Sequence, residues 1–294
     1  MKAVFTLWKQ PMDMGLMHCG YLSNFDMAVS TCLAVETARL YYKEIELVTD
    51  DSGKELLCDH LKLPFTSVNL ALNNYKHIPV QHWAYPKMVA YSVQDRPFVH
   101  LDNDVYLWDG LPSDIKSKAL AFQNIEVRDT MYNHYRQGIG RFYSSNEHST
   151  RVAHNYVPYA FNCGVVMAND IEFVQEWWEA AELYVEHPRN AWMWENHEIL
   201  TSANHNLVFE QWFPSCLAKQ RGLELDRDIG FVLLPYERKG FRFTHTLGHV
   251  KREKIVAERV WQRVKHQYPN YVRALEDIQP HYATSDKQHL LMLQ

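Results

Sequence analysis

The chain has 294 residues, of which 47% are hydrophobic and 22% charged, and its formal net charge is -5. This composition is typical of a globular protein with enough apolar residues for a large core. The negative net charge argues against a nucleic-acid-binding protein that relies on a basic face. No run of apolar residues is long enough to predict a transmembrane segment.

The cysteines argue against a disulfide framework or a zinc knuckle. Their number is odd, they lie far apart and no two form a CxxC pair. The apolar part of the first nine residues is too short for a signal peptide. Together these features predict a cytoplasmic protein. The cysteines are Cys19, Cys32, Cys58, Cys163 and Cys216.

The first 108 residues alternate between strand and helix patterns. Apolar runs predict strands at residues 2–8, 44–49, 65–70 and 97–108. Helical patterns fall between them, at residues 23–42, 54–61 and 83–93. Ser23 is a typical helix cap, and Trp83, Met88, Val89 and Tyr91 are expected core residues. The alternation predicts a parallel, doubly wound, nucleotide-binding half.

The rest of the chain is less regular. Residues 71–81 are expected to form a loop, and residues 126–154 show no period, which is typical of a functional loop. Further strands are predicted at residues 119–122, 156–167, 230–234 and 241–244, and further helices at residues 171–186, 194–203 and 252–267. No linker is evident, so we expect a single domain over residues 1–294. It would comprise a nucleotide-binding half (1–108), an acceptor-side half with a closing motif (109–267) and a C-terminal tail (268–294).

Two acids follow the apolar run Phe98–Leu101. Asp102 and Asp104 come where a buried strand would leave the core, and ligands of open α/β sheets bind beyond the carboxyl ends of the strands. Two carboxylates at this spacing can hold one hard cation such as Mg²⁺ or Mn²⁺. An ordinary turn is the alternative, because Asp and Asn side chains bond their own backbone. Bulky residues follow the acids at once, at Val105–Leu107. We therefore expect Asp102 and Asp104 to lie inside a regular element rather than at the tip of a loop.

A second motif lies near the end of the chain. His245 follows a predicted strand, Gly248 permits a tight turn, and Lys251 comes shortly after it. A neutral imidazole can complete a metal shell begun by two carboxylates. An ammonium beside it can neutralise phosphate oxygens as a leaving group departs. For this segment alone, a surface loop with a His and a Lys is the alternative.

These motifs together resemble those of a known enzyme group. Leu101–Asp104 (LDND) resembles the DxD motif of glycosyltransferases with the GT-A fold. His245–Lys251 (HTLGHVK) resembles the HxxGxxK element of the retaining group that includes glycogenin and bacterial galactosyltransferases. Phe161–Val166 (FNCGVV) resembles the "FNAG" strand of that group, and Trp83–Lys87 resembles the helix that leads into the DxD strand. The similarity extends over about residues 1 to 255. The four motifs together, in this order, are more specific than any one of them alone.

The resemblance implies an α/β fold of GT-A type, with a mostly parallel nucleotide-binding sheet flanked by helices and a smaller acceptor-side portion. It also implies roles for individual residues. Asp102, Asp104 and His245 would hold Mn²⁺ or Mg²⁺, and Lys251 would contact the diphosphate and stabilise the leaving nucleotide. Asp102 would also touch the ribose or sugar. Asn162 and Gly164 would line the donor sugar, and Lys87 would be a second phosphate contact unless it is an ordinary helix-surface lysine.

The segment Trp194–Leu200 (WENHEIL) resembles the "DQDxL" stretch of related enzymes, in which an acid faces the reacting centre. Here Asn196, His197 and Glu198 replace Asp, Gln and Asp. Glu198 keeps a carboxylate and is the first choice for a catalytic residue, with His197 beside it. Glu195 is the alternative, and exposure on a helix is the ordinary fate of either glutamate.

The expected function is a metal-dependent hexosyltransferase that uses a nucleotide-sugar donor, UDP-linked, and retains the sugar's configuration. Its acceptor is a glycan, lipid, peptide or small molecule, and Arg128, Arg136 and Arg141 favour an anionic acceptor unless they are simply solvated. A nucleotidyltransferase is one alternative, although residues 9–22 lack its Gly-rich basic loop. A non-catalytic nucleotide-sugar-binding protein is the other.

Overall fold

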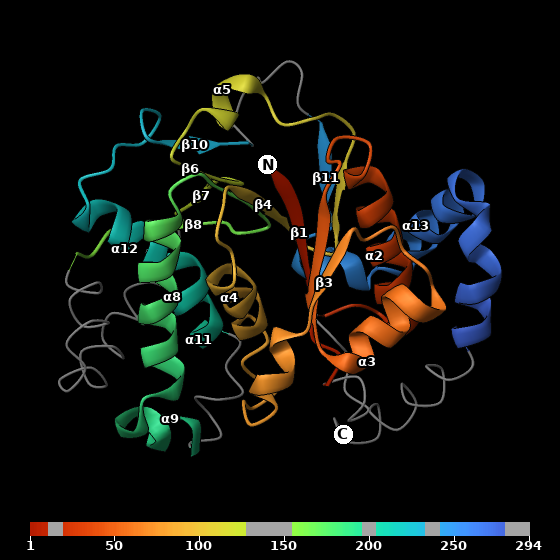
Figure 1. The fold of residues 1–294 in the computed structure, drawn as a ribbon, viewed down its shortest axis with the longest axis horizontal. Helices are drawn as coiled ribbons and strands as arrows, with labels where there is room; N and C mark the ends of the chain where they lie inside the picture. The colour runs from red at the N-terminus through yellow and green to blue at the C-terminus, as the bar shows by residue number, and fades with distance from the viewer. Residues whose placement is uncertain (11–19, 128–154, 196–203, 233–241, 280–294) are drawn as a thin grey trace. The chain divides into compact units, whose positions relative to one another are not determined.

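The computed structural model describes residues 1–10, 20–127, 155–195, 204–232 and 242–279 (Figure 1). Its largest sheet has seven strands, in the order β10 (Ile229–Phe231), β6 (Leu120–Phe122), β9 (Val165–Ala168), β4 (Phe98–Leu101), β1 (Lys2–Leu7), β2 (Ile45–Thr49) and β3 (Ser67–Asn69). Strands β1, β2 and β3 are parallel, as are β10 and β6, whereas β9 is antiparallel to β6. The predicted α/β fold with a mostly parallel sheet flanked by helices is therefore confirmed.

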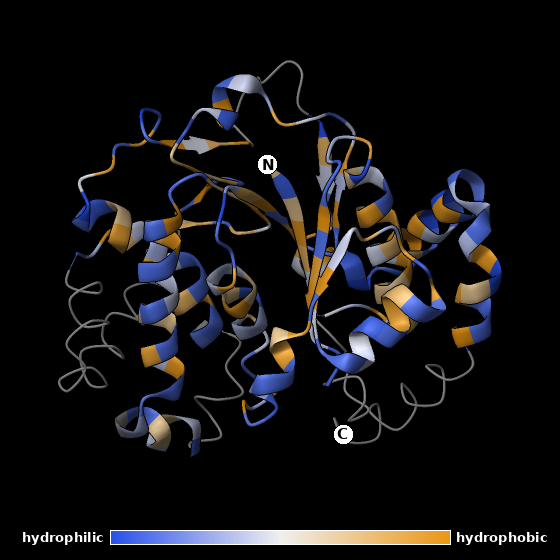
Figure 2. Ribbon diagram, in the orientation of Figure 1, coloured by the Kyte–Doolittle hydropathy of each residue, from blue (hydrophilic) through white to orange (hydrophobic). Residues whose placement is uncertain are grey.

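Two short antiparallel pairs complete the strands. They are β5 (Val105–Leu107) with β11 (Phe243–His245), and β7 (Ile125–Glu126) with β8 (Ala160–Phe161). Figure 2 shows hydrophobic residues concentrated along β1, whereas α13 (Lys254–Gln267) carries many hydrophilic ones. Within the described residues, no helix is both long and apolar enough to cross a membrane.

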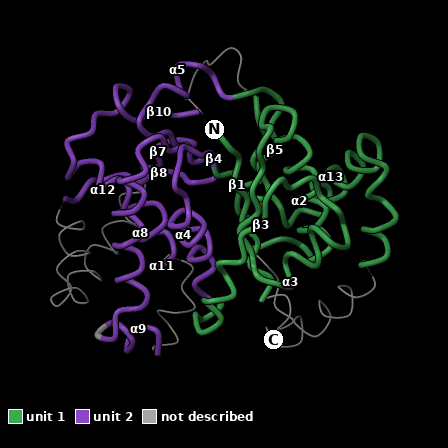
Figure 3. Tube along the Cα trace, in the orientation of Figure 1, with its two compact units in different colours: residues 1–80, 100–110, 241–294 green, residues 81–99, 111–240 purple. Residues whose placement is uncertain are grey.

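The chain divides into two compact units (Figure 3), which are described separately. The first comprises residues 1–80, 100–110 and 241–294, and the second comprises residues 81–99 and 111–240. The helical segments of the first unit are α2 (Asn24–Ala38), α3 (Asp51–Lys54), the π-helix η1 (Glu55–His60), the 3-10 helices η2 (Ala71–Tyr75), η5 (Gly248–Arg252) and η6 (Pro269–Tyr271), α13, and residues 272–279.

Helix α2 is the central helix of the first unit. The Ser23 side chain caps it by accepting a hydrogen bond from the Asp26 backbone N–H at 3.1 Å, and every residue of the helix except Asp26 is buried. Helix α2 contacts β5 on the sheet side and α13 on the other, and α13 lies beside it in Figure 1. Phe25 and Trp261 join the two helices with ring centroids 5.4 Å apart. A helix buried on both sides gives a rigid support for the strand ends that it touches.

The second unit packs its helices around α8. Its helical segments are α4 (Tyr85–Ser92), α5 (Ser113–Lys116), α8 (Ile171–Glu186), η3 (Pro188–Asn190), α9 (Ala191–Glu195), α11 (Asn204–Leu207), the π-helix η4 (Val208–Trp212) and α12 (Phe213–Gln220). The Asp170 side chain caps α8 by accepting a hydrogen bond from the Phe173 backbone N–H. Helices α4 and α12 pack on α8. Trp177 is fully buried and donates its indole N–H to the Phe209 carbonyl at 2.7 Å.

Several local predictions are wrong. The strand expected over residues 97–108 is two strands in different sheets, and the acids lie in the turn between them. The strand expected over 156–167 is also two strands, because β8 pairs with β7 whereas β9 pairs with β6. The expected loop at 71–81 contains η2, and the helix expected over 23–42 ends at Ala38. Trp83, an expected core residue, is 36% exposed, because α4 begins only at Tyr85.

Candidate functional site

The acid turn between β4 and β5 is held by hydrogen bonds from both sides. The Val105 N–H donates to the Asp102 carbonyl at 3.0 Å and closes the turn. The Asn103 amide donates to the Thr6 carbonyl at the end of β1, at 2.8 Å. The Ser30 hydroxyl on α2 donates to the Asn103 carbonyl, also at 2.8 Å. The turn and metal interpretations of this segment are therefore compatible, because the middle residue anchors the turn through its own amide and carbonyl groups.

Strand register brings His245 to the same place. In the antiparallel pair of β5 and β11, His245 lies opposite Val105. The next residue, Thr246, donates its backbone N–H to the Asp104 carbonyl at 3.1 Å. Gly248 then adopts a positive φ of 54°, a conformation that other residues rarely take. This turn starts η5, which carries Lys251 back toward the acids.

Asp104 is the centre of the cluster. Its Oδ1 lies 3.2 Å from His245 Nε2, and its Oδ2 accepts a hydrogen bond from Lys251 Nζ at 2.8 Å. The Asp104 side chain is only 3% exposed, whereas that of Asp102 is 24% exposed. One ligand atom from each of Asp102, Asp104 and His245 lies within 4.8 Å of the other two. The predicted metal ligands and the predicted phosphate lysine therefore meet within the first unit.

Electrostatics keep Asp104 ionised. Burial alone would raise the pKa of its carboxyl group. The charges of Lys251 and His245, together with the hydrogen bonds from both, outweigh burial and hold the pKa of Asp104 well below its usual range. Asp104 is thus a fixed anion in a poorly solvated place, which is what a cation site requires.

The three ligand groups fit a hard divalent cation. Two carboxylate oxygens and one imidazole nitrogen suit Mg²⁺ or Mn²⁺, and such ions keep the remaining positions of their shell for water or phosphate oxygens. Neighbouring ligands of an octahedral ion at about 2.1 Å lie about 3 Å apart. The groups of Asp102, Asp104 and His245, all within 4.8 Å of one another, therefore need only a small contraction to hold such an ion.

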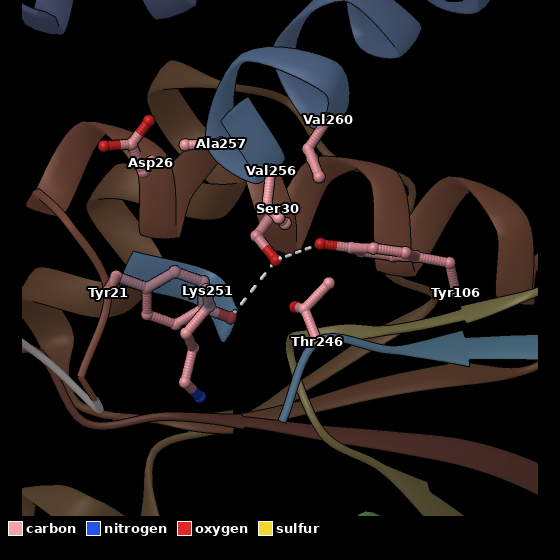
Figure 4. Close-up of a pocket in the computed structure, with 9 residues that line it drawn as sticks. All are labelled: Tyr21, Asp26, Ser30, Tyr106, Thr246, Lys251, Val256, Ala257 and Val260. Atoms are coloured by element: carbon pink, nitrogen blue, oxygen red, sulfur yellow. Dashed lines mark hydrogen bonds between the residues drawn. The ribbon is translucent and has the colours of Figure 1, made fainter. Parts of the chain in front are cut away.

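A small pocket lies beside the cluster, within the first unit (Figure 4). Its polar side holds a chain of hydroxyl groups. Tyr21 donates to the Ser30 hydroxyl at 3.1 Å, and Ser30 and Tyr106 hydroxyls lie 2.8 Å apart. Burial raises the pKa of Tyr106 to about 12, so that hydroxyl keeps its proton. The lining residues are Tyr21, Asp26, Ser30, Tyr106, Thr246, Lys251, Val256, Ala257 and Val260.

Three other predicted residues lie together in the second unit. Asn162 accepts a hydrogen bond from the Gly164 N–H at 3.0 Å and donates to Glu126 at 2.7 Å. Lys87 donates to the Cys163 carbonyl at 3.2 Å and forms an ion pair with Glu210, whose side chain is 2% exposed. Lys87, whose side chain is 12% exposed, is therefore a paired, half-buried lysine and not an ordinary helix-surface one. Its role as a phosphate contact stays a prediction.

The predicted catalytic segment lies mostly outside the described residues. Asn196, His197 and Glu198 fall there, as do Arg128, Arg136 and Arg141 of the irregular stretch. The alternative, Glu195, is the last residue of α9 and is exposed. Their roles stay predictions.

Sequence reasoning missed the residues that support the acid turn. Ser30, Tyr106 and Tyr21 belong to no motif, and a serine inside an apolar helix pattern gives no functional signal. The one available signal for Ser30 was its polarity at a position that the helix pattern predicts to be buried, because buried polar groups require partners. The fold and this site define an α/β protein with a candidate site for a divalent cation and an anionic ligand.

Residues 1–278 match the model of "Family of unknown function (DUF6734)", and the chain belongs to this family. No curated protein matches the chain.

Among solved structures, the chain is similar to the galactosyltransferase LgtC in complex with donor and acceptor sugar analogs. The identity is 12%, the TM-score is 0.36, and the match covers 79% of this chain and 73% of that one. The apo form of mouse xyloside xylosyltransferase 1 has 9% identity and a TM-score of 0.37, with 79% and 85% covered. The apo form of the glycosyltransferase GlyE of Streptococcus pneumoniae TIGR4 has 12% identity and a TM-score of 0.32, with 94% and 62% covered. With TM-scores this low, these similarities carry no part of the functional argument.

Proposed function

We propose that the protein is a metal-dependent glycosyltransferase that moves a sugar from a UDP-linked donor to an acceptor. The observation that carries the proposal is the cluster of Asp102, Asp104 and His245. Lys251 forms an ion pair with the buried carboxylate of Asp104 in this cluster. Paired acids and an imidazole suit a hard cation, and a lysine beside them suits the phosphates that such cations bind. The DxD and HxxGxxK resemblances point to the same chemistry.

In the proposed reaction, the bond between the anomeric carbon of the donor sugar and the diphosphate breaks, and a bond from that carbon to the acceptor forms. The acceptor loses a proton, and negative charge develops on the departing nucleotide. A divalent cation, when bound, supplies positive charge beside that diphosphate. Asp102, Asp104 and His245 hold the cation in place. Lys251 contributes an ammonium that meets the developing charge, and its placement before the reaction avoids the cost of reorganisation. We further propose, from the HxxGxxK resemblance, that the sugar keeps its configuration.

Donor contacts are also proposed for residues of the second unit. Asn162 and Gly164 would touch the sugar, and Lys87 would touch a phosphate. Glu198, with His197 beside it, would act near the reacting carbon. These assignments depend on the resemblance, and each is testable by a single substitution.

The direct test is donor hydrolysis. The protein is incubated with a panel of UDP-sugars, with Mn²⁺ or with a chelator, and released UDP is measured. Metal-dependent UDP release from one donor, lost in Asp104→Asn, is the expected result. Glu258→Gln is the matched control, because Glu258 is an exposed residue of α13 and its substitution changes the net charge by the same amount as Asp104→Asn.

Two other outcomes would replace the proposal. Metal-dependent formation of pyrophosphate from a nucleoside triphosphate and a sugar phosphate would identify a nucleotidyltransferase. Tight UDP binding without turnover of any donor, in the presence of a broad acceptor mixture, would identify a non-catalytic nucleotide-sugar-binding protein.

A further inference from the structure

The Asp104 carboxylate already has two partners in the protein. Lys251 Nζ bonds Oδ2 at 2.8 Å, and His245 Nε2 lies 3.2 Å from Oδ1. The hydrogen bond from His245 requires a proton on Nε2. A metal ion bound at Nε2 would need the lone pair of that nitrogen, so the contact between Nε2 and Asp104 would be lost when such an ion binds. Binding of a cation at Asp104 therefore exchanges existing contacts and does not simply add new ones.

Lys251 is held firmly against Asp104. Its ammonium lies 4.7 Å from the centroid of the Tyr21 ring, within cation–π range. The side chain is 15% exposed, so water screens its charge poorly. The Lys251 ammonium and a divalent cation at Asp102 and Asp104 would repel each other at short range.

The charge balance of the cluster leads to the same conclusion. The two carboxylates of Asp102 and Asp104 and the ammonium of Lys251 together carry one net negative charge. A divalent cation alone would give these three groups a net positive charge. A diphosphate would neutralise this positive charge, because its oxygens can ligate the cation and also accept hydrogen bonds from the Lys251 ammonium.

We propose that Lys251 makes metal binding at Asp102, Asp104 and His245 depend on an anionic phosphate ligand. This inference rests on the proposed function, and it deepens that function by stating how the binding of the cation depends on the binding of the nucleotide. Lys251 competes with the cation for Asp104 until a diphosphate offers the ammonium another partner. The cation and the nucleotide then enter together, and the cation does not bind firmly by itself.

The test is a titration with Mn²⁺ alone, followed by electron paramagnetic resonance, in which bound Mn²⁺ loses the sharp spectrum of the free ion. Lys251→Met removes the charge and keeps the length of the side chain. This variant is expected to bind Mn²⁺ about tenfold more tightly than the parent protein in the absence of nucleotide. UDP should tighten Mn²⁺ binding strongly in the parent and weakly in the variant.

Two controls locate the effect. Lys254→Met changes the net charge equally but leaves the cluster intact, so it should bind Mn²⁺ as the parent does. The double variant Lys251→Met with Asp104→Asn should lose the gain, which shows that the ion binds at the acid cluster. Circular dichroism confirms folding, and Lys251→Gln replaces Lys251→Met if the latter is unstable.

Equal or weaker Mn²⁺ binding in Lys251→Met would overturn the proposal, and so would an equal gain in Lys254→Met. In either case the metal site and the proposed function would stand. If neither the parent nor the folded variants bind Mn²⁺, with or without UDP, the metal site itself falls, and the metal-dependent function falls with it.

Discussion

The Ser30 hydroxyl on α2 donates a 2.8 Å hydrogen bond to the backbone carbonyl of Asn103, the residue between the two acids. Asn103 is more than seventy positions further along the chain, so this bond joins the central helix to the acid turn. The same hydroxyl accepts from Tyr21 and lies 2.8 Å from the Tyr106 hydroxyl. One buried serine thus helps to hold the turn that carries both carboxylates.

Ser30→Ala should therefore weaken both the fold and the site. Loss of a buried hydrogen bond that leaves its partners unsatisfied costs about 1–3 kcal/mol, which urea denaturation would detect. Metal-dependent UDP binding should also weaken, because the acid turn loses its anchor on α2. Ser92→Ala is the control, since the Ser92 hydroxyl donates to the Val89 carbonyl of its own helix α4 and bonds no other segment that the structure describes. If Ser30→Ala and Ser92→Ala behave alike, the anchor has no special role.

A second prediction concerns acid stability and His82, a fully buried residue of the second unit. Within the described residues, neither of its ring nitrogens has a hydrogen-bond partner. Its ring packs edge-on against Trp194 and His205, with centroids 4.5 and 4.9 Å away. Burial, with a smaller contribution from His205, lowers the pKa of His82 to about 3. The folded protein therefore keeps this ring neutral at every ordinary pH.

The unfolded chain takes up a proton on His82 near the ordinary pKa of 6.5, so stability falls as pH drops below that value and continues to fall to about pH 3. The loss approaches about 1.4 kcal/mol per pH unit, or about 2 kcal/mol at pH 5 relative to neutral pH. His82→Phe should remove this part of the acid sensitivity, measured by urea denaturation across pH 4–8. His266→Gln, at an exposed histidine of α13, should leave the slope unchanged. An unchanged slope in His82→Phe would show that His82 is not held neutral.

The Lys87–Glu210 ion pair supports a third prediction. Lys87 and Glu210 side chains are 12% and 2% exposed, so removal of one partner leaves a buried charge. Lys87→Met should destabilise the protein by about 3–5 kcal/mol. Lys87→Met combined with Glu210→Met should recover much of that loss, because no charge remains unpaired. A double variant as unstable as the sum of the single ones would show that the two residues do not act as a pair.

The sequence predicted the cluster itself better than its surroundings. Residue type allows a cation site at Asp102 and Asp104 and a phosphate contact at Lys251, and the DxD and HxxGxxK resemblances group these residues with His245. The parallel pairing of β1, β2 and β3 was also predictable, since apolar runs alternate with helical patterns there.

The missed features depend on contacts between distant segments. The sheet change between β4 and β5 places the acids in a turn, and only the pairing of β5 with β11 determines this. No local pattern shows that Ser30 meets Asn103, or that Glu210 lies beside Lys87. Such contacts follow from packing, which periodicity along the chain does not encode.

The central claim is that Asp104 anchors a cation that binds a nucleotide diphosphate. Calorimetric titration of UDP into the protein, with Mn²⁺ and without it, tests the claim most directly. We predict binding only with Mn²⁺ in the parent protein and none in folded Asp104→Asn. UDP binding that is equally tight in Asp104→Asn, or equally tight without metal, would contradict the account and leave Asp102–Asp104 as an ordinary turn.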